Sequence, residues 1–456
     1  MLKRSPLPLV ALAIALGVPA AASAATPIPG QYIVVLKDGA SGRSVAAEHS
    51  RSANARVLQT YDAAVDGYAA KLDAAGLAKV KADARVASVV QDAEGKAVLA
   101  QMLPTGVNRI DGEQAPAVVT AADGTTATTT GVTTPGVVAI YDTGVDTAHP
   151  DLNVAGGVNC LGAKSSYNDG TIGDQYGHGT HVAGIVGAKD DDAGVVGVAP
   201  GVQLYSVRDL DSRGSGTISS QLCGIDWITA NGPALGIKVA NSSQVMLTAR
   251  TDDGNCGYSN GDILHQAICR SVAAGITWVY GSGNSPVAFT NGAGPNYREV
   301  LTVTALGDGN GQPNVGSITK FSCGSAINTS TKKGGTTYTE VDDKYTSFSS
   351  WASSTVASQV NHVVSAPGAC IWSTFKGQAY GYMTGTSMAA PHATGTVHRC
   401  ILSGACTGTP AEIIQKIRAD ADAYNRANPF YGFTGDPLHS PVSGRYYGFL
   451  LRPGLY

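Results

Sequence analysis

The chain has 456 residues, of which 43% are hydrophobic and 14% are charged, and its formal net charge is −3. This length allows two or three domains, and the apolar content is enough for a large core. So few charges, of nearly balanced sign, exclude the basic surface of a nucleic-acid-binding protein and the polybasic patch of a membrane-surface protein.

The first 24 residues are typical of a secretory signal peptide. Lys3 and Arg4 precede an apolar run at residues 9–18, and Ala22-Ser23-Ala24 offers small residues to signal peptidase. We therefore expect cleavage after Ala24 and an extracellular product. Nothing after the signal approaches the length of a transmembrane helix, so we expect the mature protein to be soluble and monomeric, without a membrane partner.

A small α+β unit is expected at residues 25–100. The hydrophobic pattern predicts strands at 32–36, 56–58, 67–72 and 86–91, and helices at 43–52 and 74–84. This βαββαβ order is that of the ferredoxin-like, split βαβ arrangement.

Residues 101–456 alternate short apolar runs with helical patterns. Strands are expected at 137–141, 202–207, 238–241, 276–280, 300–304 and 363–366, and helices at 178–188, 219–230, 262–274, 387–401 and 410–419. Such alternation predicts an α/β fold: a doubly wound, mostly parallel sheet with helices on both faces. Residues 307–350, rich in Gly, Ser, Thr and Lys, indicate a surface insertion with room for a hairpin.

Two motifs place a carboxylate and an imidazole at the carboxyl edge of that sheet. The apolar run at 137–141 ends on Asp142-Thr143-Gly144, as expected of a buried parallel strand. In Gly177-His178-Gly179-Thr180-His181, the glycines beside His178 let the chain turn sharply into a helix. Asp142 and His178 are therefore expected to lie close together.

A third motif, Gly385-Thr386-Ser387-Met388-Ala389-Ala390-Pro391, delivers a serine to the start of a helix. Free N–H groups and the positive dipole end favour an anion beside that hydroxyl. Ser387 could be only a helix N-cap. A serine becomes a nucleophile when a histidine accepts its proton and a carboxylate orients the histidine, so Asp142, His178 and Ser387 form a candidate catalytic triad.

These three motifs resemble, in the same order, the signatures of the subtilisin-like serine proteases, the subtilases, and the pattern is proteinase K-like. The resemblance implies a subtilisin-like fold and a serine endopeptidase in which Ser387 attacks, His178 is the general base and Asp142 orients it. It covers residue 31 to about residue 405, and the tail from 407 to 456 is expected to complete the catalytic domain. A catalytically silent subtilase scaffold that acts as a binding module is the alternative.

The start of the small unit, residues 31–38, resembles the inhibitory pro-domain that precedes subtilases. This implies a pre-pro-protein with a signal peptide at 1–24, a pro-domain at 25–100 and a peptidase domain at 101–456. The pro-domain would assist folding, inhibit the enzyme in cis and be removed by the protease itself, with a cut between residues 96 and 102. A stable accessory domain is the alternative.

Amide hydrolysis builds negative charge on the carbonyl oxygen, which requires hydrogen-bond donors fixed in advance. Gly281-Ser282-Gly283-Asn284 follows a predicted strand and resembles the Ala-Ala-Gly-Asn of the family. The resemblance implies that Asn284 is the oxyanion donor, together with the backbone N–H of Ser387. An ordinary turn with Asn in a left-handed conformation is the alternative.

Subtilases hold protein and peptide substrates between two backbone strands. Gly214, Ser215 and Gly216 match one edge, and Ser243, Gln244 and Val245 match the other; Gln244 and Val245 replace Leu and Gly of the family. The pocket for P1, the residue on the acyl side of the cut, is implied to be walled by residues 243–245 and by Gly281, Ser282 and Gly283. Because Val245 adds a branched side chain, we expect a preference for small or medium P1 residues.

Eight cysteines in an exported chain predict disulfides. Their 105 possible pairings cannot be distinguished from sequence alone, but proximity favours Cys400 with Cys406 and Cys256 with Cys269. The others would then pair as Cys160 with Cys223 and Cys323 with Cys370. A zinc site is the alternative, but the characteristic C-x-x-C spacing is missing.

The remaining motif residues are interpreted as structural. His149, His181 and His392 are expected to pack or to form hydrogen bonds, because one base is enough for one nucleophile. The chemistry needs no cofactor and no metal. Structural calcium is common in the family, but Asp190-Asp191-Asp192 is expected to be a solvated loop, and Val363 stands where proteinase K relatives often have Asp. No calcium site is located.

Overall fold

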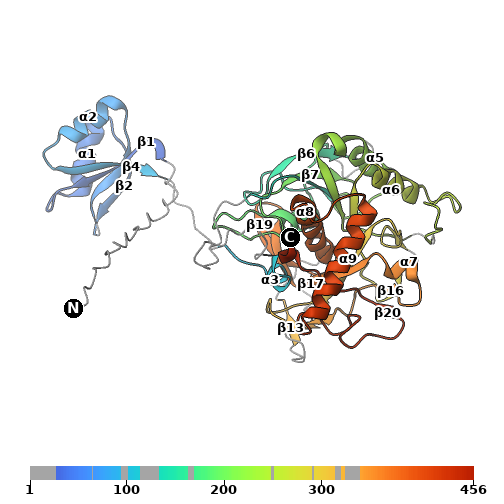
Figure 1. Ribbon diagram of the computed structural model, residues 1–456. Helices are drawn as coiled ribbons and strands as arrows, with labels where there is room; N and C mark the ends of the chain where they lie inside the picture. The colour runs from blue at the N-terminus through green and yellow to red at the C-terminus, as the bar shows by residue number, and fades with distance from the viewer. Residues whose placement is uncertain are drawn as a thin grey trace, which may run out of the picture. The chain divides into compact units, whose positions relative to one another are not determined.

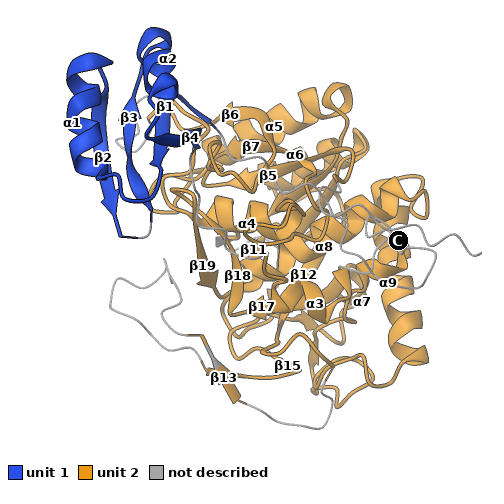
Figure 2. Cartoon of the chain, turned by 90° about the vertical axis from the view of Figure 1, so that its left-hand side faces the viewer, with its two compact units in different colours: residues 1–98 blue, residues 99–456 orange. Residues whose placement is uncertain are grey.

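The computed structural model describes residues 27–63, 65–93, 101–112, 133–162, 169–247, 251–289, 292–313, 320–323 and 339–456. The chain divides into two compact units, residues 1–98 and 99–456 (Figures 1 and 2). The predicted signal peptide and most of the predicted autocleavage segment lie outside the described residues.

The first unit is a four-stranded antiparallel sheet with two helices, which confirms the βαββαβ prediction. Its elements are β1 (Pro27–Leu36), α1 (Gly42–Ser52), β2 (Arg56–Asp62), β3 (Asp66–Lys71), α2 (Ala74–Ala82) and β4 (Val86–Ala93), with strand order β2-β3-β1-β4. Ser41 and Asp73 cap the two helices with their side chains. Val45 of α1 and Val80 of α2 share one core with Val34 and Tyr68 of the sheet, so both helices cover the same face.

The second unit is built on an eight-stranded sheet. Its strand order is β15-β12-β10-β8-β5-β7-β6, and β17 also pairs with β12. Among the described strands of this sheet, only β15 runs antiparallel to its neighbour. The strands are β5 (Val137–Asp142), β6 (Val154–Asn159), β7 (Gln203–Arg208), β8 (Ile237–Ser242), β10 (Thr277–Gly281), β12 (Leu301–Gly307), β15 (Lys344–Tyr345) and β17 (Val363–Ala369). The predicted mostly parallel sheet is confirmed.

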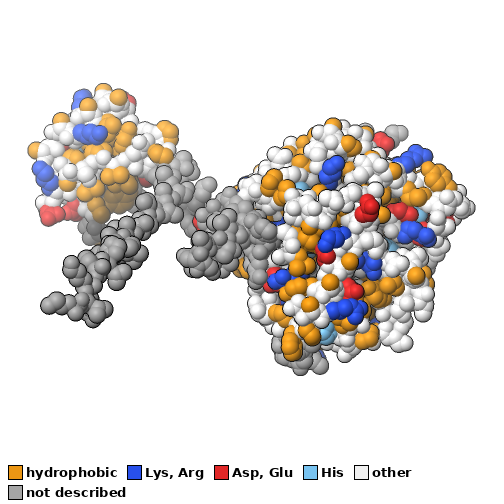
Figure 3. All heavy atoms as spheres, in the orientation of Figure 1, with side chains coloured by type: hydrophobic (Ala, Val, Ile, Leu, Met, Phe, Trp, Pro, Cys, Tyr) orange, Lys and Arg blue, Asp and Glu red, His pale blue; other side chains and the backbone are white. Residues whose placement is uncertain are grey.

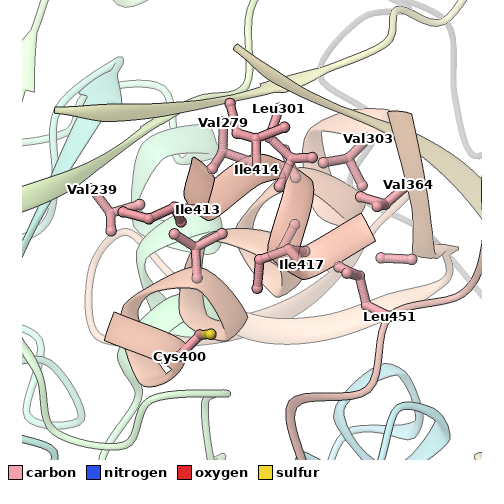
Figure 4. Close-up of a cluster of buried hydrophobic side chains, with 14 of the residues drawn as sticks. Val239, Val279, Leu301, Val303, Val364, Cys400, Ile413, Ile414, Ile417 and Leu451 are labelled. Carbon is pink, nitrogen blue, oxygen red and sulfur yellow. The ribbon is translucent and has the colours of Figure 1, made fainter. Parts of the chain in front are cut away.

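Helices cover both faces of this sheet. The main ones are α4 (His178–Gly187), α5 (Ile218–Leu235), α6 (Ile263–Ala273), α8 (Thr386–Leu402) and α9 (Pro410–Ala427). Side chains of β5 alternate between two cores: Ala139 and Tyr141 pack with α5 and α6, whereas Val138 and Ile140 pack with α4. Figure 4 shows a third core, in which sheet residues such as Val279 and Leu301 meet Ile413 and Ile417 of α9.

Several boundaries and elements differ from the prediction. Helix α5 continues past residue 230 to Leu235, where Gly236 ends it at φ 78°, and α9 continues past residue 419 to Ala427. Strand β6 and the hairpin of β18 (Ile371–Phe375) and β19 (Ala379–Met383) were not expected. In the 307–350 insertion, β13 (Lys320–Ser322) pairs antiparallel with β14 (Thr339–Val341), as the hairpin expectation required.

The described part of the second unit carries charges of both signs, interspersed over the face shown in Figure 3. The remaining short elements are α3 (Thr105–Arg109), β9 (Met246–Leu247), β11 (Gly292–Ala293), β16 (Ala352–Ser353), α7 (Ala357–Val360), β20 (Arg445–Tyr446) and the 3₁₀ turn η3 (Pro453–Leu455). None of the described helices has both the length and the apolar character needed to span a bilayer.

Four disulfides join Cys160 to Cys223, Cys256 to Cys269, Cys323 to Cys370 and Cys400 to Cys406. These are the pairs expected from the sequence, and no cysteine is left free. The bridges close loops of very different length, with sequence separations of 63 for the first pair and 6 for the last.

The long loop should matter more for stability than the short one. A bridge restricts the unfolded chain by an amount that grows with the logarithm of loop length, so loss of Cys160–Cys223 should cost about 2 kcal/mol more than loss of Cys400–Cys406. Paired Cys→Ala variants, unfolded in urea on an inactive Ser387→Ala background, test this ranking. Equal unfolding midpoints, or two reactive thiols in the native wild type, would contradict it.

Candidate active site

The three motif residues lie at the ends of elements that the fold brings together. Asp142 is the last residue of β5, His178 the first of α4 and Ser387 the second of α8. Close approach of the first two motifs requires glycine, because a Cβ on Gly179 would lie 2.1 Å from the carbonyl oxygen of Gly144. Gly177 reaches the helix start with φ 111°, in the left-handed region.

His178 and Asp142 form a buried pair. His178 Nδ1 donates to Asp142 Oδ1 at 2.7 Å, and the same oxygen accepts the Thr143 N–H at 2.7 Å. The Asp142 side chain is fully buried and that of His178 is 14% exposed. This contact fixes the imidazole tautomer with Nδ1 protonated, which leaves Nε2 to accept a proton.

The electrostatic surroundings favour a protonated His178. Burial alone lowers its pKa, but the Asp142 carboxylate, its hydrogen bond and the nearby Asp174 outweigh burial and raise the pKa above 6.5. A histidine stabilised in this way is suited to hold a proton during a reaction.

Ser387 is held by a reciprocal pair of hydrogen bonds with Ser243. Its Oγ donates to the carbonyl oxygen of Ser243 at 3.1 Å, and Ser243 Oγ donates to the carbonyl oxygen of Ser387 at 2.8 Å. Within the described residues, Ser387 and His178 share no hydrogen bond, although both line the same cleft. Such contacts are often loose without substrate, and a rotation of the serine side chain would bring Oγ toward His178.

Asn284 has a fixed amide orientation. Its Oδ1 accepts the N–H of Thr386 at 2.8 Å and the hydroxyl of Thr386 at 3.0 Å, and Thr386 Oγ1 accepts the Gly283 N–H at 3.0 Å. With Oδ1 occupied, Nδ2 is the amide atom left to donate into the cleft that Asn284 lines. Thr386 therefore couples the loop of Asn284 to the serine helix.

The cleft has a volume of about 520 Å³, within the usual range of ligand sites. It is lined by His178, Ser387, Asn284 and six of the predicted substrate-binding residues: Gly214, Ser215, Gly216, Ser243, Gln244 and Val245. Gly281, Ser282 and Gly283 are not part of this lining. Ser282 is buried and donates to the Ser350 carbonyl oxygen at 2.9 Å, so a direct substrate contact of these three stays a prediction.

Two supporting residues were missed in the sequence. Asp174 accepts the N–H groups of Tyr176, Gly177 and Thr180 and the hydroxyls of Thr143 and Thr180, so it caps the helix that begins at His178. Thr386 was read only as part of a motif. An acidic residue four positions before the histidine was the available signal for Asp174.

The other motif histidines are buried and hydrogen-bonded to the backbone, as expected. His181 Nε2 lies 3.0 Å from the carbonyl oxygens of Ile371 and Gly381, and burial lowers its pKa to about 3. His392 Nδ1 donates to the Met388 carbonyl oxygen at 2.8 Å, and burial lowers its pKa to about 4. His149 Nε2 donates to the Ala379 carbonyl oxygen at 3.0 Å.

Two groups of described residues are close enough to hold a metal, and neither includes residues 190–192 or Val363. One contains Cys256, Cys269, His265 and Glu299, but its cysteines are bonded to each other. The other contains Asp252, Asp253 and His265, and the Asp253 carboxylate already accepts four backbone N–H groups. Calcium remains without an assigned site.

Comparison with known proteins identifies both units. Residues 135–434, more than half of the chain, match the family described as the subtilase family. The chain belongs to the subtilase family. Residues 31–97 of this subtilase match the family described as peptidase inhibitor I9.

Similar subtilases include Subtilisin DY of Bacillus licheniformis, 33% identical over 294 residues that cover 64% of this chain and 85% of that protein. Subtilisin NAT of Bacillus subtilis subsp. natto is 32% identical over 372 residues, covering 80% and 78%. The crystal structure of a cold adapted subtilisin-like serine proteinase shares the fold, with TM-score 0.50 and 22% identity over 76% of this chain and 97% of that one. This subtilase is therefore a serine endopeptidase with an N-terminal I9 inhibitory pro-domain, the arrangement of a zymogen.

Proposed function

We propose that this subtilase is a secreted endopeptidase that cleaves peptide bonds through an acyl-enzyme on Ser387, with His178 as the base and Asp142 as its orienting carboxylate. The observation that carries the proposal is the 2.7 Å contact between His178 and Asp142 beside the cleft that Ser387 and Asn284 line. Mature enzyme should therefore release peptides from a denatured protein, and a fluorophosphonate should stop it.

The geometry suggests how each step occurs. A substrate strand lies between residues 214–216 and 243–245, and Ser387 Oγ leaves the Ser243 carbonyl oxygen to attack the scissile carbonyl carbon. His178 Nε2 takes the serine proton as the new C–O bond forms, and Asn284 Nδ2 and the Ser387 N–H donate to the developing oxyanion. When the intermediate collapses, His178 returns the proton to the leaving amine. Water then attacks the acyl-enzyme through the same steps, with His178 as the base, and releases Ser387.

The same reaction accounts for maturation. The chain is expected to enter the secretory route through residues 1–24, fold with its pro-domain in place and cut the connection between residues 96 and 102 itself. The pro-domain and protein substrates are then its partners, the mature enzyme is a monomer, and side chains and backbone supply all the groups that the chemistry uses.

We expect the activity to fall at acidic pH with an apparent pKa above 6.5, because the protonated form of His178 cannot act as a base and its pKa is raised. Asp174 is one of the charges that raise it, so Asp174→Asn should move the acid limb to lower pH. The pH dependence of kcat/KM, measured for the wild type and for Asp174→Asn, gives the position of the acid limb in each protein. An acid limb below 6.5 in the wild type, or one unmoved in the variant, would contradict it.

The P1 preference follows from Val245. A Cβ built on Gly292 would lie 2.8 Å from Val245 Cγ1, and one on Gly283 would lie 3.9 Å from Val245 Cγ2, so the Val245 side chain, which lines the cleft, packs against these two glycines. Forcing a large group into a packed site costs about 1–3 kcal/mol. We therefore expect Ala to be preferred over Phe at P1, and Val245→Gly to reduce that preference. The measurement is the ratio of kcat/KM for matched peptides with Ala or Phe at P1, in the wild type and in Val245→Gly. A wild type that prefers Phe would refute the expected preference.

A further inference from the structure

Three polar side chains form a connected wall at one part of the cleft. Gln244 Nε2 donates to Asp209 Oδ2 at 2.8 Å, and Gln221 Nε2 donates to Gln244 Oε1 at 3.0 Å. We call Asp209, Gln221 and Gln244 the polar wall. Gln221 and Gln244 line the cleft, and Asp209 lies behind them, fully buried.

The hydrogen bonds of the polar wall have one direction. Because Asp209 accepts from Gln244, the Gln244 amide is turned so that its oxygen accepts from Gln221. The chain of bonds therefore ends on Gln221 Oε1, to which no described residue donates a hydrogen bond. Gln221 is only 7% exposed, so this acceptor is held in place rather than free in solvent. A group that donates a hydrogen bond from the cleft would complete the chain.

The polar wall borders cavities of two sizes. Gln221 and Gln244 also line a second, small cavity of about 10 Å³, together with Tyr141, Tyr280 and Tyr297. That volume is roughly enough for one water molecule. The cleft therefore has room for a substrate side chain beside the two amides, whereas the second cavity does not.

The charge of the polar wall favours a neutral ligand. Burial raises the pKa of Asp209 well above its ordinary value, and the nearby Asp142 carboxylate adds to this effect. The two cleft-facing amides carry no charge, so a lysine or arginine side chain would lose hydration there without gaining an opposite charge.

We propose that the polar wall is a subsite, on the acyl side of the scissile bond, that selects substrates with a neutral hydrogen-bonding side chain (Asn, Gln, Ser or Thr) over an aliphatic one. The inference rests on the proposed function, which places an extended substrate along residues 243–245. An aliphatic side chain there would cover the Gln221 oxygen without donating to it, and a missing hydrogen bond of this kind costs about a factor of ten in selectivity.

The test is a set of quenched peptides with Ala at P1, in which P2, P3 and P4 are varied one at a time among Gln, Asn, Ser, Thr, Leu, Ile and Lys. Mature wild-type enzyme should prefer the neutral polar residues over Leu by about tenfold in kcat/KM at one of these positions. Gln221→Leu should reverse that preference at the same position. A wild type that prefers Leu or Lys at every position would overturn the subsite.

Two further proteins keep the test decisive. Asp209→Val/Gln244→Leu removes the Gln244 donor and its Asp209 acceptor together, so that the buried carboxyl group is not left without its amide donor, and should also favour Leu. Gln203→Leu makes the same side-chain change at an exposed position of β7 outside the cleft lining and should keep the wild-type profile. Labelling of Ser387 by a fluorophosphonate is measured in parallel: failure to label overturns the proposed function and the subsite with it, whereas a labelled enzyme with an aliphatic preference overturns the subsite alone.

Discussion

Replacing Ser387 by alanine is expected to leave the full pro-protein uncut and to lower peptidase activity by roughly 10⁶-fold, the loss known for the same change in subtilisin. Removal of the pro-domain is the first peptide bond that the enzyme must hydrolyse, so loss of the nucleophile stops processing before any substrate is met. Mass spectrometry of the secreted product, expressed in a host without other extracellular proteases, shows directly whether the pro-domain has been removed.

Ser354→Ala is the matched control, because it makes the same change at an exposed serine outside the cleft lining and should be processed like wild type. A Ser387→Ala protein that still acquires a new N-terminus near residue 100 would show that another protease makes the cut. Autoprocessing would then be wrong, whatever the activity of the mature enzyme.

Asn284→Ala is expected to lower kcat by roughly 10²- to 10³-fold with a smaller effect on KM, again the range known for subtilisin. The amide is oriented by two hydrogen bonds from Thr386, so its Nδ2 donates to the oxyanion without having to reorganise. Because the oxyanion exists only in the transition state and the intermediate, the loss should appear in kcat.

Steady-state kinetics and a thermal unfolding curve on the same preparation separate this effect from misfolding. A variant with a native unfolding midpoint and an unchanged kcat would remove Asn284 from the site. A loss confined to KM would assign Asn284 to ground-state binding instead.

Much of the fold could be predicted because local pattern and tertiary structure agree. In β5, residues 137–141 are apolar on both faces because helices cover both faces of the sheet, and this continuous apolar run is visible in the sequence. The first unit is a clear case of the same agreement, since caps, helical spacing and β-branched strands all indicate one order of elements.

The errors occur where tertiary contacts override local preference. Strand β6 contains Gly156 and Gly157, which disfavour a strand, yet its register with β7 holds it at the sheet edge. Helix α5 continues through Gly232 and Pro233, although both residues disfavour a helix interior. A Cβ at Gly232 would lie 2.9 Å from the Ile276 side chain, so the close packing of this helical turn against its neighbour needs glycine. No local signal in the sequence reports such contacts.

The residues of the candidate site also divide into those that the sequence predicts and those that it does not. Asp142, His178, Asn284 and Ser387 each sit in a motif whose glycines and flanking pattern set their position at the sheet edge. Asp209 has no such motif, and its partner Gln244 is 35 positions away, so the pair becomes visible only when the strands are placed side by side. Residues that support or tune the site were therefore harder to predict than those that carry the reaction.

The most direct test of the central claim is the position of a fluorophosphonate adduct on mature wild-type protein. Our account predicts one adduct per molecule, on the peptide that contains Ser387, the nucleophile that His178 activates. A folded, mature protein that takes up no label, as a silent scaffold would, or that carries the label on another serine, would contradict it.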